Sequence, residues 1–293
     1  MKKVAVLNID QFVKQNDIEG FYANTLEDHL ITSHKDIDQP HSHNFYVAIL
    51  FTHGSGIHEV DFTVYNVVPG SLFFLNPGQT HHWELSNDTA GYVFLHTHDF
   101  YDLQYTQNTI NQFPFFYSMH NIPCLYLKGN IQTVITNLFN QVYDENNIDE
   151  SLKKQKILSL INLVYIESTR IYIKQNPVDS KNKNTYYLKF RQLEQLIEAN
   201  FITEKSPSAY AEMLNMSPKH LNRITQAITS KTATDVILER VLLEAKKELV
   251  LQQKHFNEIA YSLGYEDYAY FSRLFKKKTN ETPSAFLKRY GKA

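Results

Sequence analysis

Histidines are concentrated in the first third of the sequence, at spacings that could bring several imidazole rings together. His41 and His43 are two residues apart, so both would point to the same face of a β-strand. His58, His81 and Trp83 follow within the same stretch. Neutral imidazoles in such a group can hold a metal ion, donate hydrogen bonds to a small ligand, or form polar walls. We take all five side chains as candidate ligand contacts, and His41, His43 and His81 as the ligands if a metal is bound.

Basic and polar residues form a second group near the C-terminus, inside an approximate internal repeat. Residues 211–224 match residues 260–274 at an offset of 49, which becomes 50 after one extra turn residue. Each copy reads as a helix, a tight turn and a second, capped helix, which is the helix-turn-helix layout. The second helices carry the candidate DNA contacts, which are Lys219, His220, Asn222, Arg223, Gln226, Tyr268, Ala269, Ser272, Arg273, Lys276 and Lys277.

A long helix predicted over residues 233–251 joins the two copies. It would span roughly 28 Å at 1.5 Å per residue, and successive major-groove faces of DNA lie about 34 Å apart. A stiff helix of this length can hold both second helices against one side of a duplex. Arg223 and Arg273 could form paired hydrogen bonds with guanine edges, whereas the lysines at 276–278 suit phosphates.

Composition and charge set the limits of these interpretations. The chain has 293 residues, of which 43% are hydrophobic and 20% charged, so it is neither a disordered nor a fibrous protein. Neither GxGxxG nor GxxxxGK[ST] occurs, and the single cysteine excludes an intrachain disulfide. Residues 1–187 hold 12 Lys and Arg against 19 Asp and Glu, whereas residues 188–293 hold 17 against 12. This asymmetry favours a polyanion partner for the C-terminal part alone.

The order of patterns predicts two domains of different class, an α+β organisation. Strands are predicted over 43–51, 57–64, 71–75 and 92–98, separated by turn residues, which favours an antiparallel β-barrel. Helices are predicted over 131–145 and 151–173, the second with two apolar faces that both need cover. We assign residues 1–174 to the first domain, 175–185 to a polar linker and 186–293 to an all-α domain with two helix-turn-helix units.

The second copy of the repeat carries a family resemblance. The stretch Phe256-Asn-Glu-Ile-Ala-Tyr-Ser-Leu-Gly-Tyr-Glu-Asp-Tyr-Ala-Tyr-Phe-Ser-Arg-Leu-Phe-Lys-Lys-Lys-Thr-Asn-Glu-Thr-Pro-Ser-Ala-Phe-Leu closely resembles the signature of the AraC family of bacterial transcription regulators. The resemblance covers residues 186–291 and implies that Lys219, Asn222, Arg223, Tyr268, Ala269, Ser272 and Arg273 face DNA. One departure is Asn280, where the family usually has glycine. Asparagine tolerates the left-handed backbone of a helix C-cap, so we expect the same turn.

The histidine-rich stretch resembles a cupin barrel. His41-x-His43 and Gly70-x5-Asn76-Pro77-Gly78-x2-His81 are similar to the cupin motifs, and AraC-like regulators often carry a cupin-like sensing domain. Active cupins usually have a carboxylate four or five residues after the second histidine, where this chain has Val47 and Ala48. A site of two histidines and one carboxylate for iron is therefore absent from the sequence. We expect a metal-free pocket for a sugar or another polar metabolite, and no cofactor.

Three functions remain open at this point. The first is a cytoplasmic regulator without a membrane segment, whose first domain senses a small molecule and which binds double-stranded DNA as a homodimer through helices 131–145 and 151–173. The resemblance further implies an activator that contacts RNA polymerase and has no catalytic residues. The second is a metal-dependent cupin enzyme with an accessory helical domain. The third is a scaffold whose first domain only dimerises.

Overall fold

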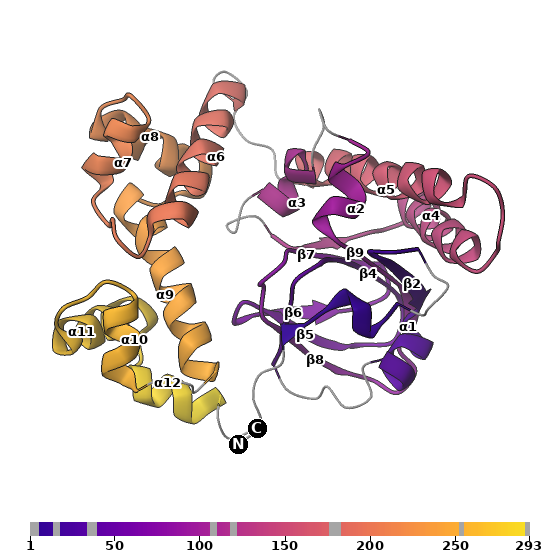
Figure 1. Ribbon diagram of the computed structural model, residues 1–293, viewed down its shortest axis with the longest axis horizontal. Coiled ribbons are helices and arrows are strands. Elements are labelled where there is room, and N and C mark those ends of the chain that lie inside the picture. The colour runs from indigo at the N-terminus through magenta and orange to yellow at the C-terminus, as the bar shows by residue number, and fades with distance from the viewer. Residues whose placement is uncertain are drawn as a thin grey trace. The chain divides into compact units, whose positions relative to one another are not determined.

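The computed structural model describes residues 6–13, 18–33, 40–105, 110–117, 122–175, 183–251 and 255–290 (Figure 1). The described residues up to Gln175 form one compact unit, and those from Lys183 onward form another. Strands occur in the first unit, whereas the described part of the second unit is helical. None of the helices in these ranges is long and apolar enough to cross a membrane.

A five-stranded antiparallel sheet lies at the centre of the first unit, in the order β10-β7-β4-β9-β2. Its strands are β2 (Phe21–Thr25), β4 (Tyr46–His53), β7 (Ser71–Leu75), β9 (Ala90–His96) and β10 (Cys124–Tyr126). A three-stranded antiparallel sheet consists of β5 (Gly56–Val60), β6 (Thr63–Val67) and β8 (His81–Leu85). The remaining pair, β1 (Val6–Leu7) and β3 (Ser42–His43), is parallel, which departs from the antiparallel expectation.

Strand β4 shows how the layers of the first unit are built. Its residues alternate between two buried faces, so β4 reads as a continuous apolar run. Ala48 and Leu50 belong to the core shared with the helices, whereas Val47 and Ile49 belong to the core shared with the three-stranded sheet. The five-stranded sheet is therefore the middle layer, with helices on one face and the smaller sheet on the other (Figure 1).

Two long helices cover one face of the central sheet. They are α4 (Asn130–Asn146) and α5 (Lys153–Gln175), close to the predicted ranges 131–145 and 151–173. The predicted stripe of α4 is buried at Ile135, Phe139 and Val142. On α5, Ile161 is fully buried, but Leu163 on its second apolar face is 45% exposed. Only one of the two apolar faces of α5 is fully covered within this unit.

One strand prediction in the smaller sheet was wrong, and one of its strands was missed. The range 57–64 is not one strand, because a hairpin reverses the chain at Asp61 and Phe62, between β5 and β6. Both residues have positive φ, 46° and 66°, as a two-residue hairpin turn requires. We also did not predict β8 as a strand, although it pairs with β5 along its whole length. Neither turn residue is glycine or asparagine, so the usual turn signal is missing.

The second unit contains the predicted series of short helices. They are α6 (Lys183–Asn200), α7 (Pro207–Met213), α8 (Pro218–Thr229), α9 (Ala233–Leu251), α10 (Phe256–Ser262), α11 (Tyr268–Thr279) and α12 (Pro283–Tyr290). Both ends of the predicted linker 175–185 are helical, because residue 175 belongs to α5 and residues 183–185 belong to α6. Residues 176–182 lie outside the described ranges.

The internal repeat is visible in the backbone of the second unit. Helices α8 and α11 both end at a left-handed residue, Ser230 with φ 57° and Asn280 with φ 64°, so the expected turn at Asn280 is present. The two helix-turn-helix turns contain Asn215 and Gly264, also at positive φ. A Cβ on Gly264 would lie 2.1 Å from the Ile202 carbonyl oxygen, so only glycine fits there.

Short elements complete the first unit. They are α1 (Leu26–Asp28), α2 (His98–Asp102), α3 (Pro114–Tyr117), two 3₁₀ turns at Ile9–Gln11 and Ile110–Gln112, and a π-helical turn at His29–Ser33.

Candidate functional site

Helix α8 presents a polar face to solvent. Ser217 caps its start by accepting a hydrogen bond from the His220 amide, and Leu221 and Ile224 anchor the opposite face in the core. The candidate residues Lys219, Asn222, Arg223 and Gln226 are exposed, and His220 is half-buried. The helix thus leaves its positive and amide side chains available for contact with another molecule.

Helix α11 is built in the same way in the second copy. Asp267 caps its start through the Ala269 amide, and Phe271 and Phe275 are buried. The candidates Ala269, Arg273, Lys276 and Lys277 are exposed, whereas Tyr268 and Ser272 are half-buried. The Tyr268 ring stacks on Phe256 with 6.2 Å between ring centroids. Both helix-turn-helix units contact α9, so both candidate faces belong to one framework (Figure 1).

Two polar residues of these helices also have structural partners. The Asn222 side-chain oxygen accepts a hydrogen bond of 3.1 Å from the Ala233 amide at the start of α9. Lys278, which we had grouped with the phosphate-binding lysines, pairs instead with Asp235 at 2.5 Å. Asn222 therefore stabilises the α8–α9 turn whatever it contacts outside, and Lys278 is already engaged within the protein.

The histidines form a buried chain of hydrogen bonds in the first unit. His58 Nε2 lies 2.9 Å from His81 Nδ1, and His81 Nε2 lies 3.2 Å from His43 Nε2. His43 Nδ1 lies 3.2 Å from the Phe45 carbonyl oxygen. His41 is also buried, and its backbone pairs with that of His81. The structure thus brings the four predicted histidines together, with half-buried Trp83 beside His58 and His81.

The Phe45 carbonyl fixes the direction of every proton in this chain. A carbonyl only accepts, so His43 Nδ1 carries the hydrogen and neutral His43 accepts at Nε2. His81 then donates from Nε2 and accepts at Nδ1, and His58 donates from Nε2. Burial lowers the pKa of His43 and of His58 to about 3, with the charge of His41 as a second cause. His43 and His58 are therefore neutral near neutral pH, as these hydrogen bonds require.

A small cavity adjoins these histidines. Its lining residues are Leu7, Phe12, His29, His43, Phe45, Val47, Ile49, His81, Trp83, Val93 and Leu95. The free space at its centre holds about one water molecule. His43, His81 and Trp83 thus reach the cavity as candidates, whereas His41 and His58 are not part of its lining. Within the described ranges, no group of three or more His, Cys, Asp or Glu side chains is arranged to hold a metal ion.

Two family models match this chain. Residues 32–161 match an AraC-like ligand binding domain, and residues 210–289 match a helix-turn-helix domain. The chain belongs to the AraC family of transcriptional regulators. The first match contains the histidine chain of this AraC-family protein, and the second contains both candidate DNA-reading helices.

Relatives of this AraC-family chain are described as regulators. The HTH-type transcriptional activator RhaR of Enterobacter sp. (strain 638) is 22% identical over 254 residues, 86% of this chain and 88% of that protein. The bifunctional transcriptional activator/DNA repair enzyme AdaA of Bacillus subtilis (strain 168) is 33% identical over 90 residues, 31% of this chain and 43% of that protein. A structure of fatty acid-bound ToxT from Vibrio cholerae is 13% identical, covering 94% of this chain and 97% of its own, with a TM-score of 0.44. The family models and RhaR favour a sensing regulator over the cupin enzyme.

Two residues of the AraC-family sites escaped the sequence reasoning. The Tyr186 ring of α6 lies 5.9 Å from the His220 ring and 6.0 Å from the Arg223 guanidinium carbon. His29 lines the cavity, and burial lowers its pKa to about 3. Its Nδ1 lies 3.1 Å from the Tyr22 hydroxyl. Neither residue belongs to a repeat or a histidine pair, so no spacing pattern marks them.

Proposed function

We propose that this AraC-family regulator binds specific DNA sites through α8 and α11 together. The observation that carries the proposal is that two matched helices, each with an exposed basic or polar face, belong to two helix-turn-helix units that both pack on α9. Arg223 and Arg273 are the candidate base-reading residues, because arginine can donate two hydrogen bonds to guanine. Lys276 and Lys277 would contact phosphates and contribute salt-sensitive affinity.

Selection of bound genomic fragments with the full-length protein tests this proposal. We expect a preferred site with two parts about one DNA turn apart. Arg223→Ala and Arg273→Ala should each weaken binding at that site by about 1–3 kcal/mol. The first variant should lose preference at the part read by α8, and the second at the part read by α11. Lys277→Ala should instead weaken binding to all DNA sequences alike and reduce the dependence of the affinity on salt concentration. Unchanged affinity in both arginine variants would refute the assignment of the reading helices.

The lining of the cavity supports a particular class of effector. Seven of its side chains are aliphatic or phenyl groups, and the imidazoles and the indole supply the polar edge. A fully hydroxylated sugar would bury several hydroxyls without partners there, at about 1–3 kcal/mol each. We infer a compact effector with an apolar body and at most one polar group, because both ring nitrogens of His43 and of His81 are already hydrogen-bonded within the protein. Its binding would select a more open arrangement of the cavity, because the present space is so small.

Trp83 makes this inference measurable, since it is the only tryptophan of the chain and lines the cavity. We expect compact amphipathic compounds to change its fluorescence and to raise the unfolding temperature, whereas free sugars do neither. His43→Leu should abolish the response to an active compound. Stabilisation by sugars alone would contradict the proposed effector class. No response to any compound would favour the scaffold that only dimerises.

The remaining assignments are proposals about the assembly. We propose that the chain acts in the bacterial cytoplasm, where it reaches chromosomal DNA, and that it regulates without a catalytic step. A homodimer through α4 and α5 would cover the exposed face at Leu163. Activation through contact with RNA polymerase is proposed by analogy with RhaR, which is described as an activator.

A further inference from the structure

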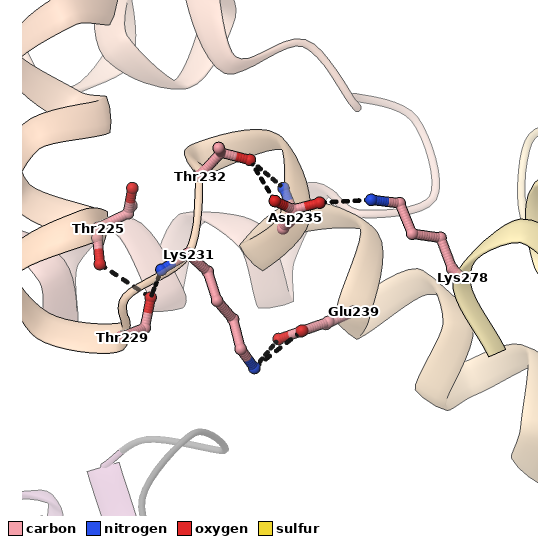
Figure 2. A network of polar contacts seen from close by, with 7 residues as sticks. All are labelled: Thr225, Thr229, Lys231, Thr232, Asp235, Glu239 and Lys278. Carbon is pink, nitrogen blue, oxygen red and sulfur yellow. Dashed lines mark hydrogen bonds and ion pairs between the residues drawn. The ribbon is translucent and has the colours of Figure 1, made fainter.

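A polar network joins the end of α8, the start of α9 and the end of α11 (Figure 2). Asp235, in the first turn of α9, is its centre. One carboxylate oxygen accepts a hydrogen bond of 2.5 Å from the Thr232 hydroxyl, and the other lies 2.5 Å from Lys278 Nζ. The Thr232 hydroxyl also caps α9 by accepting from the Asp235 amide at 3.1 Å. These contacts hold the carboxylate in one orientation toward α11.

Lys278 differs from the two lysines before it. Lys276 and Lys277 are exposed on α11, where they can meet a phosphate backbone. Lys278 is also exposed, but it reaches a residue 43 positions earlier in the chain. The Lys278 contact also lowers the pKa of Asp235, which keeps the carboxylate ionised at neutral pH. This lysine therefore connects the second helix-turn-helix unit to the start of the joining helix.

The first helix-turn-helix unit contacts the same end of α9. Asn222 of α8 accepts a hydrogen bond from the Ala233 amide, two residues before Asp235. Lys231, in the turn between α8 and α9, pairs with Glu239 one turn further along α9 at 2.8 Å. A short path of contacts thus runs from α8 through the first turns of α9 to α11.

We propose that Asp235 is a positioning residue that sets the orientation of α11 relative to α8 through its ion pair with Lys278. The inference rests on the proposed function, because it matters only if both helices contact one DNA site. When one helix binds DNA, the second helix is held close to the neighbouring major groove. This proximity increases the affinity only if the orientation of the second helix already matches that groove. The Asp235–Lys278 pair therefore contributes to binding at two-part sites and not to either helix alone.

Asp235→Asn separates this role from simple electrostatics. The variant removes a negative charge from the DNA-binding unit, so charge alone would raise affinity for every DNA. We expect the opposite at a two-part site, where affinity should fall about fivefold, the upper range for a partly exposed ion pair. Affinity for a DNA that keeps only the part read by α11 should stay the same or rise slightly. Both DNAs are taken from the sites selected by the wild-type protein.

Matched lysine variants provide the control. Lys277→Gln and Lys278→Gln each remove one positive charge from the same helix. Lys277→Gln should weaken one-part and two-part DNA by the same factor, whereas Lys278→Gln should lower the ratio of two-part to one-part affinity. The exchange Asp235→Lys with Lys278→Asp should restore that ratio.

Two outcomes would overturn the proposal. An equal loss on both DNAs in Asp235→Asn would show that the residue only stabilises the fold, and no loss on either DNA would show that the pair does not orient α11. Thermal unfolding of each full-length variant reports the stability separately. If the wild-type protein selects no two-part site, the proposed function itself fails, a result that is distinct from either of these.

Discussion

His58 Nε2 lies 2.9 Å from His81 Nδ1 in the first unit, where both imidazoles are buried. The bond requires a neutral His81 that accepts at Nδ1, because its Nε2 donates to His43. A proton added to this chain would place two donors face to face and a charge in a buried site. The first unit is therefore more stable when these histidines are neutral than when one of them is protonated.

We predict that the first unit loses stability as the pH falls below about 6.5. The folded pKa values of His29, His43 and His58 are about 3, below the ordinary value of 6.5. Between these values the unfolded chain binds protons that the folded chain does not, so unfolding becomes more favourable. The free energy of unfolding should fall by about 1.4 kcal/mol per pH unit for each such histidine.

Denaturant unfolding followed by Trp83 fluorescence between about pH 7 and pH 5 measures this slope. His29→Gln should make the slope shallower by about one proton, because a glutamine side chain does not titrate. His53→Gln is the matched control, since His53 is exposed. A stability that does not change over this range would contradict the burial of neutral imidazoles.

Asn222 should have two separable roles. Its side-chain oxygen satisfies the Ala233 amide, so Asn222→Ala should lower the free energy of unfolding of the second unit by about 1 kcal/mol. Asn222→Asp keeps an acceptor oxygen and should retain most of this stability, but it places a negative charge beside DNA. We expect thermal unfolding to show a lower stability for Asn222→Ala than for Asn222→Asp. We expect DNA titration to show weaker binding for both variants. Equal stability of the two variants would show that the bond to Ala233 contributes nothing.

Local signals explain why the helical unit could be predicted closely. The predicted range 233–251 is the observed range of α9, and Ser217 followed by Pro218 marks the start of α8. Capping residues, prolines at first helical positions and a 3.6-residue period act within a few residues of each other. The repeat then places both candidate helices without knowledge of tertiary contacts. The 3.6-residue period also marks the buried positions of these two helices, and their remaining positions are therefore predicted to be exposed.

Long-range contacts explain what the sequence did not reveal. The turn at Asp61 and Phe62 has no glycine, and its positive φ values depend on the pairing of β5 with β6. His29 reaches the cavity from a helical turn, and its spacing from the other histidines does not match the two-residue spacing of a strand face. The Asp235–Lys278 pair joins residues 43 positions apart, so either charge alone looks like an ordinary surface residue. Such pairs become visible only once the helices are packed.

Tyr186 should assist the reading of DNA by supporting Arg223. Its ring lies within 6.0 Å of the guanidinium carbon, a distance suited to a cation–π contact. Tyr186→Ala should weaken specific DNA binding by about 0.5–1 kcal/mol, the range for exposed pairs of this kind. Tyr186→Phe keeps the ring and should bind as the wild type does. In the background of Arg223→Ala, the alanine change at Tyr186 should have no further effect, and an additive loss would argue against the contact.

Leu163 should mark the dimer interface, if α4 and α5 pair two subunits. It is 45% exposed on α5, and Val134 on α4 is 38% exposed, so both leave apolar surface in contact with water. A glutamate at 163 would bury a charge in the dimer but remain solvated in the monomer, so Leu163→Glu should weaken dimerisation at least about tenfold without unfolding the chain. Leu103→Glu is the control, since Leu103 is 78% exposed and lies outside both helices. Sedimentation of the full-length proteins compares them. If Leu163→Glu sediments as the wild type and the control do, the exposed apolar face is not what joins two subunits, and DNA sites read by the dimer must be explained by another contact.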